Sequence, residues 1–211
     1  MTTKLRGMPP GRAGRVWLRR RLAVAARGAD LLERKLRILV GEEQSFALLV
    51  ERTQAEWEEA ARELDRWMLR SSLLSGERGL RLAAAAEDAD VEVTWRLTMG
   101  VRYPAEVSCQ LPRRSSSHAV PDNAALVQAV AAAERAVTAA VDHAAAVAAL
   151  AAMRAEMVST RRQLRAVRDR WIPRLEAAHH AVTVALDDQE HDESVRLRWA
   201  AGSKQRGAVG R

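Results

Sequence analysis

A regular spacing of apolar residues dominates the first third of the chain. From residue 18 to residue 74, positions separated alternately by four and three residues are apolar at 14 of 17 places. The repeat consists of Leu18, Leu22, Ala25, Ala29, Leu32, Leu36, Leu39, Glu43, Phe46, Val50, Thr53, Trp57, Ala60, Leu64, Trp67, Ser71 and Leu74. This spacing indicates a helix over residues 12–75 that packs along one face against another helix, with a seam of about 85 Å. The glycine pair Gly76 and Gly79 is expected to end it.

The period changes to two after residue 90. The apolar residues that alternate with polar ones are Val91, Val93, Trp95, Leu97, Ala105, Val107, Cys109 and Leu111. Alternation on both sides of a junction at Thr98, Met99 and Gly100 predicts a two-stranded hairpin. Residues 76–121 are therefore expected to form an insert, with a short helix in the alanine-rich residues 80–89 and a loop at 112–121.

A second long helix is predicted for residues 122–200, with Asp122 or Asn123 as its N-cap. The repeat is weak in its first part because nearly every residue there is alanine. The expected seam is Leu126, Val130, Ala133, Val137, Ala140, Ala144, Val147, Leu150, Met153, Met157, Thr160, Leu164, Val167, Trp171, Leu175, Ala178, Val182 and Ala185. Between Trp171 and Leu175 the repeat slips by one residue, and Pro173 lacks a backbone donor there, so a kink is predicted.

Neither long helix can bury its seam alone, so we expect the two to lie antiparallel. The predicted fold class is mainly α, a long antiparallel two-helix coiled coil with a short β-hairpin insert between the helices. Residues 1–11 and 201–211 are expected to be flexible tails. Trp17 and Trp199, near the two termini, are expected to meet across the helix pair.

Composition narrows the class of protein. Only 4% of the 211 residues are aromatic, which favours an extended helical shape over a globule with a thick core. Cys109 is the single cysteine, so an intramolecular disulfide and a cysteine-based zinc site are excluded. No run of about 18 apolar residues exists and Arg19, Arg20 and Arg21 interrupt the first apolar stretch, so we expect neither a membrane span nor a secretory signal.

The sequence contains no recognisable catalytic arrangement. The glycines between Gly7 and Gly14 are not followed by the Gly-Lys-Ser/Thr of a nucleotide-binding loop. His179 and His180 are separated from His191 by about three helical turns, which favours surface histidines over a metal site. We therefore expect a chain that is not an enzyme, with no catalytic, cofactor-binding or metal-binding residues.

The basic surplus is uneven along the chain. Residues 1–40 hold 11 basic and 2 acidic side chains, residues 41–90 hold 6 and 12, and residues 161–211 hold 11 and 7. In an antiparallel pair the two basic regions come together at the terminal end. That end is expected to bind an acidic partner, either a protein or a nucleic acid.

Three blocks of residues resemble one known family. The blocks are Arg20, Arg21, Leu22, Val24, Ala25, Arg27, Gly28, Leu31, Leu32, Lys35 and Leu39; Met99, Gly100, Val101 and Pro104; and Ile172, Pro173, Arg174, Leu175 and Glu176, followed by an acidic run at 186–190. They resemble, in the same order, motifs of the D subunit, the central-stalk subunit of V-type and A-type rotary ATPases. The resemblance covers about residues 12–200.

The resemblance implies a rotor subunit that hydrolyses no ATP itself. It implies two long antiparallel helices whose terminal end enters the axial hole of a catalytic hexamer of A and B subunits. The middle of the chain would bind the small F subunit of the stalk, and the lower part would dock on the socket subunit above the proteolipid ring. Such a subunit transmits torque between nucleotide sites and proton or sodium transport, on the cytoplasmic side and peripheral to the membrane.

Three groups of residues are the candidate partner-binding and coupling sites. The basic cluster Arg15, Arg19, Arg20 and Arg21 is expected to face acidic loops of the hexamer, although solvent-facing charge is an equal alternative for each arginine. Met99, Gly100, Val101 and Pro104 are expected to shape the hairpin tip and contact neighbouring subunits. Pro173, Arg174 and Glu176 are expected to set the kink. Gly28 is interpreted as a site of close backbone approach.

Two other classes of function remain as alternatives. A basic helical nucleic-acid-binding protein is suggested by a dense patch consisting of Arg161, Arg162, Arg165, Arg168, Arg170 and Arg174. A coiled-coil adaptor or membrane-surface protein is suggested by the alanine-rich amphipathic helices. Neither accounts for a hairpin between two matched helices or for the three ordered motifs, so the rotor subunit is the leading hypothesis and we expect no nucleic-acid partner and no direct membrane insertion.

Overall fold

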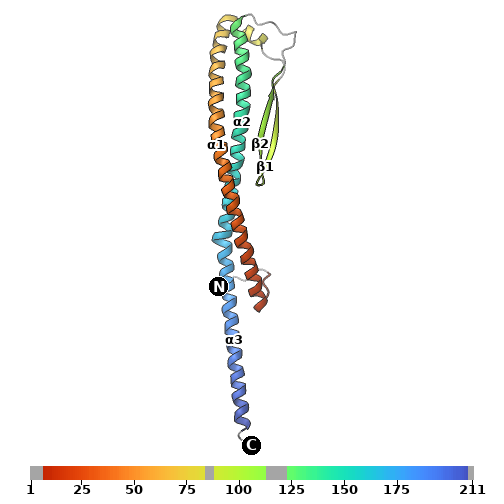
Figure 1. Ribbon diagram of the computed structural model, residues 1–211, viewed down its shortest axis with the longest axis vertical. Helices are drawn as coiled ribbons and strands as arrows, with labels where there is room; N and C mark the ends of the chain where they lie inside the picture. Colours follow the sequence, from red (N-terminus) through yellow and green to blue (C-terminus); the bar gives the residue numbers. More distant parts are fainter. Residues whose placement is uncertain (1–6, 84–87, 113–122, 209–211) are drawn as a thin grey trace. The chain divides into compact units, whose positions relative to one another are not determined.

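The computed structural model describes residues 7–83, 88–112 and 123–208. Helix α1 spans Gly11–Ala83, strands β1 and β2 span Asp90–Thr98 and Val101–Gln110, and helices α2 and α3 span Ala124–Arg165 and Ile172–Ala208 (Figure 1). The predicted fold class is confirmed, because long helices flank a two-stranded antiparallel hairpin. Residues 113–122 of the expected loop, and residues 1–6 and 209–211 of the expected tails, lie outside the described residues.

The chain divides into two compact units, each described separately below. The first, here called the terminal unit, joins Met1–Arg34 to Thr160–Arg211. The second, here called the hairpin unit, is Lys35–Ser159. Helix α1 contributes to both units, and α2 enters the terminal unit with its last turns.

The predicted seam of α1 is buried, including its polar members. Leu18 and Leu39 are fully buried, and so is Ser71. Thr53, another polar seam residue, donates its hydroxyl to the carbonyls of Leu49 and Val50. Trp57 and Leu74 are the two seam residues that stay exposed. The helix leaves regular geometry at Gly76, whose φ of 61° favours glycine, and helical residues then continue to Ala83.

The early seam of α2 differs from the predicted one by a single residue. Val137 and Val147, expected inside, are exposed. Leu126 and Leu150 of the predicted seam are buried, and the other buried residues are Ala125, Ala129, Ala132, Ala136, Ala146 and Ala149. The true frame extends the spacing of Leu150 backward without interruption, through Ala146, Ala136 and Ala132. Alanine gives little contrast between the faces of a helix, so the larger valines suggest a frame in which they face inward. In the structure Val137 and Val147 point outward.

Asn123 is the N-cap of α2. Its side-chain carbonyl accepts a hydrogen bond from the Leu126 N–H at 2.9 Å, and its amide group donates to the Ser75 hydroxyl of α1. One residue therefore satisfies a free helical N–H and ties the start of α2 to α1.

Replacing Asn123 by alanine is expected to lower the free energy of unfolding by about 1 kcal/mol, because both hydrogen bonds are lost. Urea unfolding followed by circular dichroism measures the change. Thr138→Ala is the matched control, since the Thr138 hydroxyl only donates to the carbonyl of Glu134 on its own helix. An equal loss in both variants would contradict the capping role.

A π-helical segment, Ala166–Trp171, joins α2 to α3 in the terminal unit. Its geometry is seen at Ile172, whose N–H donates to the carbonyl of Val167, five residues back. A π turn holds one residue more than an α turn, which matches the one-residue slip of the seam before Pro173. The segment predicted to kink therefore contains a π turn.

The core of the terminal unit lies between α1 and α3. Leu18 and Leu175 are both fully buried, and Ala25 completes the cluster. Residues packed around it include Met8, Trp17, Leu22, Val167, Trp171, Ile172, Ala178 and Val182. Met8 therefore packs on the core although it lies in the expected N-terminal tail. The ion pairs of Arg12 with Glu190 of α3, at 2.8 Å, and of Glu33 with Arg168 of the π-helical segment show that α1 runs antiparallel to this part of the chain.

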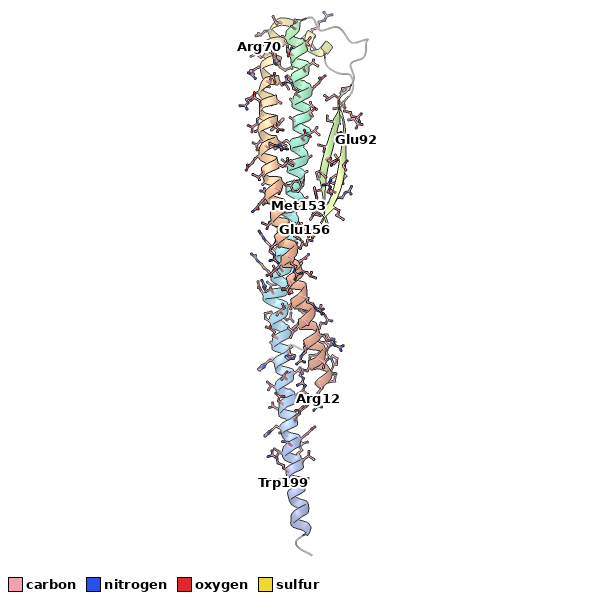
Figure 2. All side chains as sticks on the ribbon, in the orientation of Figure 1. Arg12, Arg70, Glu92, Met153, Glu156 and Trp199 are labelled. Atoms are coloured by element: carbon pink, nitrogen blue, oxygen red, sulfur yellow. The ribbon has the colours of Figure 1, made fainter. Side chains whose placement is uncertain are left out.

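Three details of α3 differ from expectation. Trp199 is 79% exposed, whereas Trp17 is half-buried in the core, so the two tryptophans do not meet. Leu186, instead of the predicted Ala185, is the buried residue of its turn. Helix α3 also continues to Ala208, so most of the expected C-terminal tail is helical. Trp199 lies on the part of α3 beyond Glu190, the partner of Arg12 (Figure 2).

The hairpin packs on the helices of its own unit through β2. Val101 and Tyr103 are buried together with Leu39 of α1 and Met153 and Met157 of α2. The Tyr103 ring meets the edge of Phe46, with centroids 5.1 Å apart. Strand β1 is exposed along nearly its whole length. The pairing register shifts between Thr94 and Trp95, next to Pro104. Proline lacks a backbone donor, so within a sheet it is found at edges and bulges.

The helical stretch Ala124–Ala200 is long and apolar enough to cross a membrane by length and composition alone. The sequence predicts no span because it has no uninterrupted apolar run, whereas mean hydropathy over a window tolerates a few polar residues within the run. One such helix is weak support for a span, because a packed, alanine-rich helix passes the same test. Only 28% of its most apolar window is buried, and Leu150, Met153 and Leu175 are among the residues of this stretch that pack on other parts of the chain.

Candidate functional site

Polar contacts join α1 to α2 at intervals along the hairpin unit. Lys35 pairs with Glu156 at 2.5 Å, Glu43 with Arg154 at 2.8 Å, and Glu63 with Arg135 at 2.6 Å. Between them, His143 Nδ1 lies 3.2 Å from the Thr53 hydroxyl, and the His143 ring stacks on Trp57. These contacts fix the register of the two helices and oppose sliding.

The ion pair between Glu63 and Arg135 changes the titration of both groups. The hydrogen bond from Arg135, and then its charge, lower the pKa of Glu63 against an opposing effect of desolvation. The pKa of Arg135 is raised by the same hydrogen bond. Because the folded chain favours the ionised form of Glu63, this group stabilises the fold at pH values above the ordinary pKa of glutamate. The contribution is lost as the pH falls through the lowered pKa. The helix contact is therefore present at neutral pH.

The hairpin tip is anchored where α1 and α2 are joined by Lys35 and Glu156. A Cβ built on Gly100 would lie 4.0 Å from Lys35 Nζ, so the turn sits directly over this ion pair. Both side chains of the pair are only about a quarter exposed, at 28% and 29%. Glu156 and Met153 are seen on α2 beside the turn (Figure 2). Together with buried Val101, this contact holds the tip against the helices.

The turn itself is strained at one residue. Met99 and Gly100 have φ values of 51° and 83°, and Thr98 pairs with Val101, which is the geometry of a type I′ turn. Glycine adopts this conformation freely, whereas a methionine there is disfavoured by about 1 kcal/mol. Met99 is nevertheless 47% exposed, so no burial of its side chain within the described residues compensates for the strain. An exposed, strained residue is a candidate for contact with another molecule.

The basic cluster lies near the start of α1. Arg19 and Arg20 are exposed, and neither forms an ion pair with any described residue. Arg21 instead lies over the Trp17 ring, 4.7 Å from its centroid, and Arg15 is half-buried. The structure therefore separates the cluster into two free charges, Arg19 and Arg20, and two that take part in local packing.

The third predicted group lies just after the π turn. Pro173, Arg174 and Glu176 are all exposed, whereas Leu175 between them is fully buried against Leu18. Pro173, Arg174 and Glu176 are therefore accessible to a partner, and the packing of Leu175 holds the segment in place.

Gly28 does not have the predicted role. A Cβ added to Gly28 meets nothing within 4 Å, so no close backbone approach in the described residues requires glycine there. The prediction of a close approach is wrong. The small residues buried in this part of the α1 seam are Ala25 and Ala29.

The described residues hold no group of three histidine, cysteine or acidic side chains that could bind a metal ion. The sequence did not reveal that Lys35 and Glu156 support the hairpin tip. A search for opposite charges at antiparallel positions could have found Glu43 with Arg154 and Glu63 with Arg135, which follow one register. Lys35 with Glu156 departs from that register, so such a search would have missed this pair.

The motif residues meet in two places. Lys35 and Leu39 of the first motif lie against Gly100 and Val101 of the second in the hairpin unit. Leu22 and Ala25 of the first motif pack with Leu175 of the third in the terminal unit.

Comparison with known protein families gives a match over most of the chain. Residues 16–202 match the model of the family described as the D subunit of ATP synthase. No curated protein gives a significant match.

Proposed function

Because the chain belongs to the family of ATP synthase D subunits, we propose that it is the non-catalytic central-stalk rotor of a V/A-type ATPase or ATP synthase. In this role it transmits torque between ATP hydrolysis or synthesis in the catalytic hexamer and proton or sodium transport in the membrane ring. The observation that carries the proposal is the family match over residues 16–202. The family is a stalk subunit of a complex peripheral to the membrane, and we propose the cytoplasmic side as its place.

The helix contacts suit a part that carries torque. A shaft made of two helices resists twisting only if the helices cannot slide. Here the ion pairs of Glu43 with Arg154 and of Glu63 with Arg135 oppose sliding in the hairpin unit, and Glu33 with Arg168 does so in the terminal unit. Apolar seams between the contacts exclude water and stabilise the pairs.

The partners follow from the exposed groups. We propose that Arg15, Arg19, Arg20 and Arg21 face acidic loops of the hexamer of A and B subunits, with Arg19 and Arg20 as the free charges. At the hairpin tip, exposed Met99 and Gly100 contact neighbouring subunits, whereas Val101 and Pro104 are buried and shape the tip. The small F subunit binds the middle of the chain, and the socket subunit binds its lower part. The segment of Pro173, Arg174 and Glu176 acts mainly by shaping the helix.

The nucleic-acid alternative gains no support. One arginine of the proposed patch, Arg168, is already paired with Glu33 inside the terminal unit. The family match gives no reason to expect a nucleic-acid partner.

Purification of the tagged chain from its own cells tests the proposal. Nucleotide-binding A and B subunits are expected to co-purify with it in a complex that hydrolyses ATP. Recovery without them, together with an affinity for DNA that falls steeply with salt, would favour the nucleic-acid alternative and contradict the rotor.

Met99→Asn is expected to separate stability from coupling. Asparagine tolerates a positive φ and Asn-Gly favours the type I′ turn, so the hairpin gains about 0.5–1 kcal/mol of stability. If Met99 contacts a neighbouring subunit, ion transport per ATP hydrolysed falls in the assembled complex although the hairpin is more stable. A more stable variant with unchanged coupling would show that Met99 serves only the turn.

A further inference from the structure

Strand β1 presents an apolar face that the described residues leave largely uncovered. Val91, Val93, Trp95 and Leu97 share one face of the hairpin, and their exposure ranges from 38% for Val93 to 69% for Leu97. The buried residues of the tip, Val101 and Tyr103, are cross-strand partners of Thr98 and Arg96, so they belong to the opposite face. On β2, the residues that share the face of the strip are more buried: Pro104, the partner of Trp95, is buried, and Val107 and Cys109 are half-buried. The exposed apolar strip is therefore confined to β1.

The outer edge of β1 lacks two features that protect a free strand edge, a proline and a bulge. The sheet of the described residues has two strands, so each has one unpaired edge. On β2, Pro104 and the register shift beside it interrupt regular pairing. Strand β1 has neither a proline nor an extra residue over Asp90–Thr98. Proline and bulges hinder the addition of a strand, so β1 is the edge open to pairing.

The backbone of β1 is correctly oriented for such pairing. In a hairpin with a two-residue turn, the two residues that flank the turn form hydrogen bonds with each other. Along each strand, successive residues then direct their N–H and C=O groups alternately to the partner strand and to the free edge. Because Thr98 flanks the turn, the even-numbered residues of β1 direct their N–H and C=O groups to β2. Val91, Val93, Trp95 and Leu97 direct theirs to the free edge.

The sequence of β1 is complementary to itself when two copies run antiparallel. With Thr94 opposite Thr94, Val93 lies opposite Trp95 and Val91 opposite Leu97 of the other copy. Glu92 then lies opposite Arg96, twice in the pair because of the two-fold axis. Opposite charges, threonine pairs and aromatic–aliphatic pairs are the favourable cross-strand neighbours in antiparallel sheets. The same register pairs odd-numbered residues, whose backbone groups face the free edge.

We propose that the free chain forms a two-fold dimer through β1, giving a four-stranded antiparallel sheet centred on Thr94. The charge complementarity of Glu92 and Arg96 identifies the occupant of the edge as a second copy of this chain. Arg96 lies 3.7 Å from Glu106 of its own hairpin with most of its side chain exposed, so further donors of the guanidinium remain for the partner. The dimer is a property of the chain alone and does not rest on the proposed function.

Charge reversal of the full-length chain tests the dimer. The wild-type protein is expected to dimerise with rising concentration in light scattering coupled to size exclusion. Glu92→Arg and Arg96→Glu each place like charges opposite one another at two places, so each is expected to raise the dissociation constant about tenfold. Glu106→Gln removes the Arg96 contact within the chain without changing the edge, and is expected to leave the dimer unchanged.

Mixing the two charge-reversal variants gives the decisive result. The arginine introduced at position 92 of one variant would then face the glutamate introduced at position 96 of the other. At the second contact, the unchanged Arg96 of the first variant faces the unchanged Glu92 of the second. The mixture is expected to dimerise as well as wild type, although neither variant does so alone, and circular dichroism confirms that both are folded. A wild-type chain that stays monomeric, or a dimer that the single reversals do not weaken, would overturn the proposal.

The single cysteine supplies a distance. Cys109 lies opposite Val91 on β2, so two spin labels at Cys109 would be separated by three strand spacings across the sheet and about six residues along it. Strand geometry gives a separation of about 25 Å. Pulsed electron spin resonance of the dimer is expected to show this distance. A dimer with a clearly different distance would show that the contact is elsewhere and would contradict the β1 register.

Discussion

Leu39→Ala is expected to lower the free energy of unfolding by about 3 kcal/mol. Leu39 is fully buried, and it packs with Val101 and Tyr103 of the hairpin and with Met153 of α2. The truncation removes apolar contacts and leaves a cavity where helix, helix and hairpin meet. Urea unfolding monitored by circular dichroism at 222 nm measures the loss.

Leu48→Ala is the matched control for this variant. It makes the same chemical change on the same helix, but Leu48 is 67% exposed, so the expected loss is below about 0.5 kcal/mol. Equal losses in the two variants would show that the cluster around Leu39 is not the core of the hairpin unit. A loss confined to Leu39→Ala supports the packing of the hairpin on both helices.

The double charge reversal Arg19→Glu, Arg20→Glu is expected to weaken binding to the isolated A and B hexamer by about 10- to 100-fold at low salt. Both arginines are exposed and neither pairs with a described acidic residue, so the reversal breaks no ion pair within the described residues. Arg21 is left unchanged because it stacks on Trp17. If acidic loops face these residues, attraction turns into repulsion, and the effect diminishes as salt rises. Titration of the hexamer measures the affinity.

Arg161→Glu, Arg162→Glu is the control for charge. These arginines are also adjacent, exposed and helical, so the net charge changes equally. If the chain is the rotor, this pair is expected to cause a much smaller loss of hexamer binding. Equal losses would mean that only net charge matters, and unchanged binding in both variants would remove the basic cluster from the hexamer interface. A loss of DNA binding in the control variant would instead support the nucleic-acid alternative.

The seam of α1 could be predicted from the sequence because large apolar residues contrast with charged ones. Leu18 and Leu39 lie where the spacing placed them, and the same spacing located the buried polar residues Thr53 and Ser71. In α2 the contrast disappears, because alanine occupies both faces. Only packing against α1 then decides which alanines are buried, and the true frame differs by one residue.

The π turn and the hairpin show two other limits of sequence reasoning. The slip before Pro173 revealed that one extra residue had to be accommodated, but a kink and a π turn both satisfy that requirement. The alternation of Val91, Val93, Trp95 and Leu97 correctly indicated a strand, although it could not show that this apolar face is exposed. Which face of a hairpin packs depends on contacts far away in sequence, here those of Val101 with Leu39.

The candidate site was predicted in part. The motif spacing identified the hairpin tip, but the strain at Met99 depends on the sign of φ, which sequence does not show. The charge count identified the basic end of the chain. It could not distinguish Arg19 and Arg20, which are free, from Arg21, which is held on Trp17.

Rotation of this chain within the assembled motor is the most direct test of the rotor role. With the A and B subunits fixed to a surface and a bead attached to Cys109, the only cysteine of the chain, ATP is expected to drive continuous rotation of the bead in one direction. A bead that stays still while the same complexes hydrolyse ATP would contradict a rotor and place the chain in the stationary part of the complex.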